Sequence, residues 1–200
     1  MKKLLKNEKG FTLIELAIVL VIIGIIIGAV MKGQDLIENA RHKKLANTVK
    51  QFEVLAWGFL DRKGYFPGDD SPRDGLIEGN VSTALISSGR FLDPPTTNSI
   101  ILGSFTFYVW LGNSGTRNII AVTNTDGATA AVLGNEELAY MEAFDTSIDG
   151  TANGNGGRVR ATTTAMTLNS GSWLVTGTPA SATWDTANVR ALIYYFDRNP

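Results

Sequence analysis

A long, nearly uninterrupted apolar run near the N-terminus dominates the hydrophobic pattern of the chain. Between residues 11 and 31 the only polar side chains are those of Thr12 and Glu15. At a rise of about 1.5 Å per residue, such a run forms a helix of roughly 30 Å, the thickness of a bilayer's hydrocarbon core. The pattern therefore predicts a membrane-spanning helix over residues 11–31. Since an unpaired carboxylate inside such a helix is costly, we expect Glu15 to have a designated partner.

After residue 31 the apolar pattern becomes one-sided. Apolar residues recur at alternating spacings of four and three, which marks one face of a helix. The residues of this stripe are Leu45, Val49, Phe52, Ala56 and Phe59. We predict one continuous helix over residues 11–61, in which an amphipathic half (residues 32–63) packs on a globular domain formed by residues 64–200.

The rest of the chain reads mainly as strands. Residues 104–111 and 118–123 predict a hairpin, and residues 159–167, 172–175 and 189–196 predict further strands. Two short helices are expected, at residues 81–88 and at residues 135–144 with Asn135 as cap, and residues 176–188 read as a loop. This order predicts an α+β fold, with one long N-terminal helix packed on a mostly antiparallel β-sheet.

The junction in front of the apolar run carries a specific motif. Residues 1–10 are short and basic and end at Gly10, whereas a secretory signal places its small-residue cleavage site after the apolar region. Residues 9–15, KGFTLIE, resemble the processing motif of type IV prepilins and of type II secretion pseudopilins. Many major pilins have a proline where this chain has Lys32, so the chain departs there from the common pattern.

The resemblance implies a pilin-like fold and a processing pathway. Residues 1–10 would be a leader that a prepilin peptidase removes after Gly10, leaving an N-methylated Phe11. Glu15 would pair with the terminal amine of Phe11 in a neighbouring subunit, while residues 11–31 serve first as a membrane anchor and then as filament core. The implied partners are other copies of the chain or related pilins, and the assembly platform of a pilus or type II secretion machine.

Composition narrows the function classes. The net charge is −1 and becomes −4 without the leader, so no nucleic-acid partner is predicted. The chain has no cysteine and a single histidine, His42, and we therefore expect no enzyme. His42 lies within a basic cluster with Arg41, Lys43 and Lys44, where we expect it to be solvated. That cluster would contact phospholipid head groups or acidic residues of another subunit.

Two acidic stretches are candidate cation sites. Residues 145–157 alternate Asp, Asn and Gly, which supply the oxygen ligands and flexible backbone that Ca²⁺ requires, without EF-hand spacing. The candidate ligands are Asp145, Asp149, Asn153 and Asn155. The alternative is a plain surface loop with no cofactor, which the same residue types also favour. Residues 69, 70 and 74 are aspartates in a turn-rich stretch, read as a solvated turn rather than a cation site.

Together these features predict a structural subunit of a type IV pilus-like filament. It would be a single-pass inner-membrane protein before assembly and part of a cell-surface filament afterwards. One alternative is a pseudopilin in a periplasmic type II secretion pseudopilus. Another is a minor tip subunit that acts as an adhesin or binding module, which an exposed aromatic pair such as Tyr108 and Trp110 would support.

Overall fold

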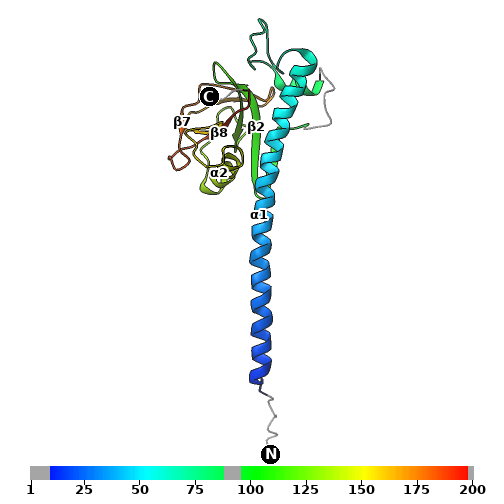
Figure 1. Cartoon of the computed structure of the whole chain (residues 1–200), viewed down its shortest axis with the longest axis vertical. Coiled ribbons are helices and arrows are strands. Elements are labelled where there is room, and N and C mark those ends of the chain that lie inside the picture. Colours follow the sequence, from blue (N-terminus) through cyan, green and yellow to red (C-terminus); the bar gives the residue numbers. More distant parts are fainter. Residues whose placement is uncertain (1–9, 88–95, 198–200) are drawn as a thin grey trace, which may run out of the picture. The chain divides into compact units, whose positions relative to one another are not determined.

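The computed structural model describes residues 10–87 and 96–197 (Figure 1). The chain divides into two units, Met1–Ala40 and Arg41–Pro200. The predicted leader, apart from Gly10, lies outside the described residues, as does the last residue of the helix predicted at 81–88.

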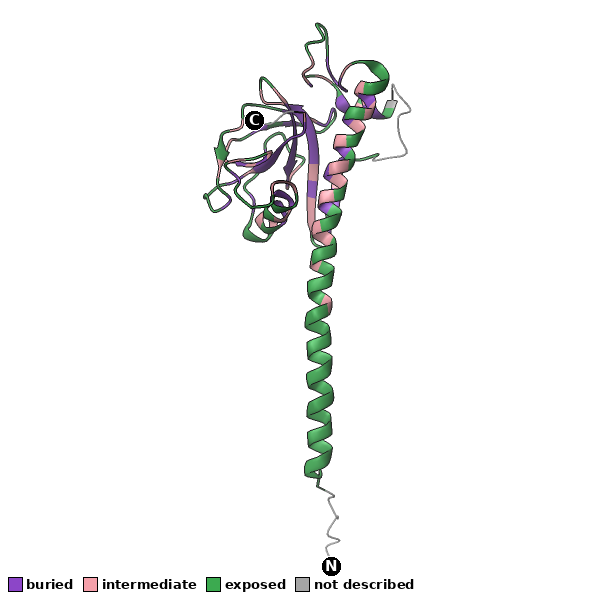
Figure 2. Cartoon of the chain, in the orientation of Figure 1, coloured by how far each residue is buried: buried purple, intermediate pink, exposed green. Residues whose placement is uncertain are grey.

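Helix α1, Leu13–Lys63, confirms the long N-terminal helix. Its first part consists almost entirely of strong apolar residues without proline, and these side chains are exposed along the first unit (Figure 2). Within the described residues, α1 is the one helix long and apolar enough to cross a membrane, judged by length and composition. The helix ends where Gly64 takes a φ of 81° and its N–H donates to the carbonyl of Leu60.

The second unit contains a mostly antiparallel sheet. Its strand order is β5-β6-β2-β3-β8-β4-β7, with β1 also paired to β2, and the β2–β6 pairing is parallel. The strands are β1 Ser99–Leu102, β2 Phe105–Asn113, β3 Asn118–Thr123, β4 Val159–Thr162, β5 Thr167–Asn169, β6 Leu174–Thr176, β7 Ser181–Ala182 and β8 Ala191–Tyr195. The α+β architecture predicted from the sequence is thus present.

Both faces of the sheet are covered. On one face, the sheet packs against the end of α1 and against helix α2, Asn135–Asp149. The stripe of α1 predicted from Leu45 to Phe59 is the buried one, and it packs with the alternating β2 residues Phe107, Val109 and Leu111. The other face holds a second cluster, in which Trp110 and Ile193 pack with Met166 and neighbouring apolar residues.

Several predicted elements need correction. The single strand expected at residues 159–167 is two strands, β4 and β5, which lie in different parts of the sheet. Helix α2 runs five residues beyond its predicted end at residue 144. Asn135 is not its cap, because Gly134 takes the N-cap position and donates its N–H to the Glu137 carboxylate at 2.7 Å. Strand β7 lies within the loop predicted at residues 176–188.

Two more segments differ from expectation. Strand β1 was not predicted, because its four residues are too few to show the alternation of apolar and polar positions that marks a strand. The short helix predicted from residue 81 is present as the π-helix η1, Thr83–Ser87, in which Leu85 is buried and Ile86 is 45% exposed. Leu85 therefore docks this segment on the core, with Ala84 packed beside it, while Ile86 does not.

Candidate functional site

The predicted cleavage site lies directly before α1. Gly10 and Phe11 precede the helix, and the Phe11 side chain is 84% exposed. A peptidase would therefore meet an exposed backbone at this bond, and nothing in the described part of the chain covers it.

Glu15 has a partner within its own chain. Its Oε2 accepts hydrogen bonds from the backbone N–H and the hydroxyl of Thr12, both at 2.8 Å, and its own N–H donates to Thr12 Oγ1 at 3.3 Å. This reciprocal arrangement is a capping box at the start of α1, and the spacing T-x-x-E signals it in the sequence. The prediction paired Glu15 only with a neighbouring subunit and missed this local role.

No described residue covers the apolar side chains that follow Glu15. Up to Met31 the large apolar side chains are between 45% exposed, at Ile23, and 67% exposed, at Leu20 and Ile25. A Cβ added at Gly24 or Gly28 would meet no atom within 4 Å, so neither glycine is required by a contact inside this chain. Such a continuous apolar surface requires lipid or other apolar helices around it.

The basic cluster of α1 is engaged with the globular unit. Lys44 Nζ donates to the carbonyl of Ile101 in β1 at 3.0 Å. The predicted solvation of His42 is wrong, because its ring packs edge-on against Tyr140 of α2, with ring centroids 4.8 Å apart. The contact joins two helices that are far apart in the sequence, so the basic neighbours of His42 do not reveal it.

A polar cluster joins the amphipathic half of α1 to the sheet. The hydroxyl of Tyr194 in β8 donates to Glu53 Oε2 at 2.8 Å and accepts from Lys50 Nζ at 3.1 Å. Arg158 lies 3.8 Å from the other Glu53 oxygen. Burial raises the pKa of Tyr194, and its hydrogen bond to Glu53 adds to the increase. The cluster fixes one orientation of this helix face on the sheet.

Asp145 is a buried carboxylate that organises the segment after α2. Its Oδ2 accepts hydrogen bonds from the backbone N–H groups of Asn153 and Gly154, at 2.9 and 3.0 Å, and from the indole N–H of Trp184 at 2.7 Å. Burial raises the pKa of Asp145 although these three donors act in the opposite direction. The side chain predicted as a calcium ligand thus ties the loop and Trp184 to the end of α2.

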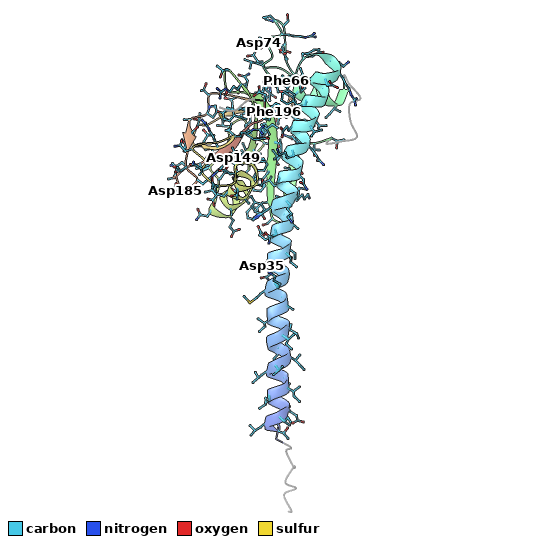
Figure 3. The ribbon with its side chains drawn as sticks, in the orientation of Figure 1. Asp35, Phe66, Asp74, Asp149, Asp185 and Phe196 are labelled. Atoms are coloured by element: carbon cyan, nitrogen blue, oxygen red, sulfur yellow. The ribbon has the colours of Figure 1, made fainter. Side chains whose placement is uncertain are left out.

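The other predicted calcium ligands are dispersed around this point. Asp149 Oδ2 accepts the N–H of Val159 at 2.8 Å, and Asn155 is exposed (Figure 3 labels Asp149). Within the described residues, no three acidic, histidine or cysteine side chains form a group that could hold a metal. A calcium ion held through the Asn side chains and backbone carbonyls as well stays a prediction.

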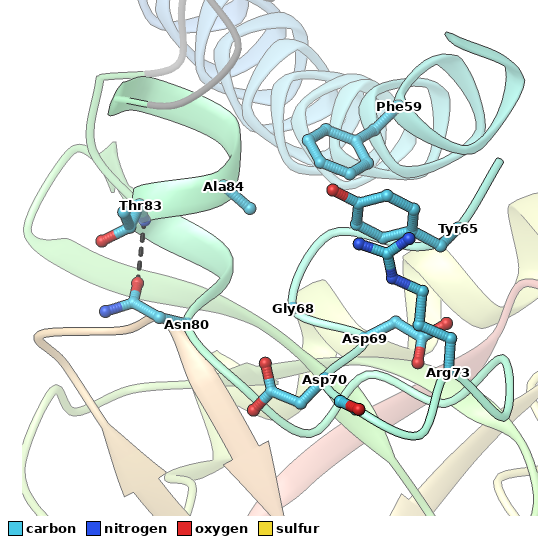
Figure 4. A pocket seen from close by; sticks show the side chains of 10 residues that line it. Phe59, Tyr65, Gly68, Asp69, Asp70, Arg73, Asn80, Thr83 and Ala84 are labelled. Atoms are coloured by element: carbon cyan, nitrogen blue, oxygen red, sulfur yellow. Dashed lines mark hydrogen bonds between the residues drawn. The ribbon is translucent and has the colours of Figure 1, made fainter. Parts of the chain in front are cut away.

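A polar hollow of about 360 Å³ lies between the end of α1 and the segment before η1 (Figure 4). Asp69 lines it and is only 6% exposed, so the predicted solvated turn is wrong for this aspartate, although Asp70 and Asp74 are exposed. Burial raises the pKa of Asp69. Arg73 also lines the hollow, and its guanidinium lies 3.6 Å from the centre of the Tyr65 ring. The hollow suits water or a small polar group.

The aromatic pair that would have supported a binding module is not exposed. Trp110 is fully buried, and its indole N–H donates to the hydroxyl of Thr123 at 2.8 Å. Tyr108 is half-buried, with its ring centre 6.4 Å from that of Trp110. Trp110 belongs to the second core cluster because the segment containing Met166 covers this face of the sheet.

Comparison with known proteins identifies the N-terminal region. Residues 5–31 match the family model described as the prokaryotic N-terminal methylation motif. No curated protein and no solved structure matches the chain. The match covers the junction at Gly10 and Phe11, the capping pair of Thr12 and Glu15, and the exposed apolar stretch that follows.

Proposed function

We propose that this chain, which carries the N-terminal signature of type IV pilins and pseudopilins, is a structural subunit of a type IV pilus-like filament. The observation that carries the proposal is the junction of an exposed Gly10–Phe11 bond with an apolar helix that no described residue covers. The motif is that of a structural family, processed by a prepilin peptidase and anchored in a membrane through its apolar helix.

Polymerisation would replace lipid by neighbouring helices. Burying most of one such helix removes well over ~1,000 Å² of apolar surface from contact with lipid or water. At about 25 cal/mol per Å² this corresponds to tens of kcal/mol gross, against a lipid environment that already satisfied the same side chains. Apolar contact would therefore stabilise the filament, but it would not fix how the subunits align. A specific contact is needed to set the register between subunits.

Glu15 is suited to that register role. Its Oε2 accepts both Thr12 hydrogen bonds, while Oε1 accepts none from the described residues and so can accept one from the amine of a neighbouring Phe11. A buried carboxylate and a buried ammonium are each costly alone and tolerable as a pair. The capping box would hold the Glu15 side chain in place before the neighbouring amine arrives.

Two substitutions separate the capping role from the pairing role. Glu15→Ala should still insert and be processed, but sheared filaments should fall at least tenfold, whereas the exposed control Glu142→Ala should assemble normally. Thr12→Ala removes the hydroxyl contacts of the capping box, keeps the backbone N–H that donates to Glu15 and keeps the carboxylate, so it should assemble better than Glu15→Ala. Normal filament yield from Glu15→Ala would contradict the pairing role, and equal defects in both variants would reduce Glu15 to a helix cap.

The cellular location of the processed protein distinguishes a surface pilus from a type II secretion pseudopilus. Lys32 in place of the proline of many major pilins, and the lack of cysteine, depart from those pilins. The length of the region after α1 departs in turn from a compact major pseudopilin, and we favour a pilus subunit. Processed protein in sheared extracellular filaments supports this assignment, while processed protein confined to membrane and periplasm would support a type II secretion pseudopilin.

A further inference from the structure

A small basic hollow lies at one end of the sheet, between the β2–β3 turn, β4 and β8. It has a volume of about 240 Å³. Its lining includes two arginines and three aliphatic hydroxyl side chains, Arg117, Arg160, Ser114, Thr116 and Thr178, together with Tyr195. Most ligand pockets for drug-sized molecules span roughly 300 to 1,000 Å³, so this hollow suits a single small group or one sugar ring.

Arg160 is held in a fixed position. Its Nε donates to the carbonyl of Gly157 at 3.3 Å, and one terminal nitrogen donates to Ser181 Oγ at 3.2 Å. The guanidinium also lies over the ring of Tyr195, 5.6 Å from its centre. Because a guanidinium carries five N–H donors, these contacts leave further donors available to a ligand. The arginine is therefore pre-organised, which reduces the entropy lost on binding.

Arg117 has no such engagement. Its guanidinium makes no hydrogen bond or ion pair to any residue that the structure describes, although its backbone carbonyl accepts from Ser114 in the turn. Among the described residues no carboxylate lines the hollow; the nearby Asp197 accepts the N–H of Asn118 at 3.0 Å and is not part of the lining. By contrast, Arg158, which directly precedes β4, lies 3.8 Å from Glu53. The described lining therefore places two cationic side chains at one hollow with no acidic side chain to neutralise them.

We propose that this hollow binds a carboxylated sugar residue of an acidic polysaccharide. Guanidinium groups form forked, charge-assisted hydrogen bonds with planar carboxylates. Two guanidinium groups would therefore bind a carboxylate more tightly than they would bind a neutral group. The three hydroxyl side chains can both donate to and accept from the hydroxyl groups of a sugar ring. An acidic side chain of a second protein copy would use the arginines but would leave the hydroxyl lining without partners, so a sugar fits the lining better.

The site is tested by ligand-observed NMR titration of the full-length chain in detergent micelles. The probes are D-glucuronate, neutral D-glucose and inorganic phosphate, at low and at high salt. We expect glucuronate to bind at least tenfold more tightly than either glucose or phosphate, and to weaken as salt rises because the attraction is partly electrostatic. Arg117→Gln should weaken glucuronate binding at least tenfold without altering the melting temperature, because Arg117 has no described structural partner.

Controls make the outcome decisive. Arg62→Gln removes an equal charge from the exposed end of α1 and should bind glucuronate like the unmodified chain. Arg160→Lys keeps the charge but loses the fork, and should bind less tightly than the unmodified chain while staying folded by circular dichroism. Equal binding of phosphate and glucuronate, binding that Arg117→Gln leaves intact, or no glucuronate binding up to tens of millimolar would each overturn the proposal. Because processing and assembly at the N-terminus are measured separately, failure here leaves the filament assignment standing.

Discussion

Replacing Asp145 tests whether a buried carboxylate holds the C-terminal part of the domain together. In Asp145→Ala, the N–H groups of Asn153 and Gly154 and the indole N–H of Trp184 lose their common acceptor. Leaving a buried donor unpaired costs about 1–3 kcal/mol, whereas removing a buried charge recovers part of that cost. We therefore expect a net loss of about 2–4 kcal/mol in the free energy of unfolding, or roughly 10 °C in melting temperature for a domain of this size.

Asp145→Asn gives the matched comparison. An amide oxygen can take the place of Oδ2 and accept the same three hydrogen bonds, while the amide nitrogen replaces Oδ1, which has no hydrogen-bond partner among the described residues. We expect the free energy of unfolding to fall by no more than about 1 kcal/mol at pH 7. The neutral amide oxygen is a weaker acceptor than the carboxylate, but the amide also avoids the cost of burying a charge. Asp185→Asn, an exposed position beside Trp184 (Figure 3), serves as the control and should change nothing.

The pH dependence of this pair follows from the raised pKa of Asp145, which burial causes. Because the folded state holds this proton more tightly than the unfolded chain does, Asp145 contributes most stability below its ordinary pKa. That contribution is lost as the pH rises through the folded pKa, so the stability of Asp145→Asn should gain relative to that of the unmodified chain as the pH rises above the ordinary pKa of an aspartate.

The assay is guanidinium unfolding of the full-length chain in detergent, followed by tryptophan fluorescence and near-UV circular dichroism. A loss below about 0.5 kcal/mol in Asp145→Ala would refute the role of the three hydrogen bonds. A loss in Asp145→Asn as large as that in Asp145→Ala would show that the negative charge itself is needed, as a bound cation would require.

Two further predictions concern the same domain. Tyr194→Phe removes the hydroxyl between Glu53 and Lys50, and should cost about 1–3 kcal/mol in the unfolding assay, since hydrogen bonds to charged groups are among the stronger ones; an unchanged stability would mean that the ion pairs of Glu53 suffice alone. If calcium binds the segment after α2, millimolar Ca²⁺ should raise the melting temperature above its value in EGTA, and Asp149→Asn should abolish that rise. Equal melting temperatures in Ca²⁺ and EGTA would favour the plain loop.

The periodic elements were predictable because they depend on local pattern. The stripe from Leu45 to Phe59 and the alternation in β2 both follow from burial on one face, and both appear in the structure. The spacing T-x-x-E also predicts the capping contact of Thr12 and Glu15. The resemblance to pilins instead assigned Glu15 a partner in a neighbouring subunit.

Contacts between segments that are far apart in the chain could not be predicted from the sequence. Asp145 looked like a loop ligand because its neighbours are turn formers, but α2 continues through it, and Trp184 lies 39 positions away. The strand pattern allowed an exposed Trp110, whereas in the structure the segment around Met166 covers this face of the sheet. The basic hollow brings together Arg117 of the β2–β3 turn and Arg160 of β4, and no local pattern predicts that they lie at one site.

The most direct test of the central claim is mass spectrometry of the N-terminus in two fractions, sheared extracellular filaments and washed membranes. The account predicts abundant sheared protein that begins at N-methylated Phe11, with the preceding residues up to Gly10 removed. Chains that keep Met1 to Gly10 in every fraction would contradict processing at this junction, and with it the filament function inferred from the N-terminal helix.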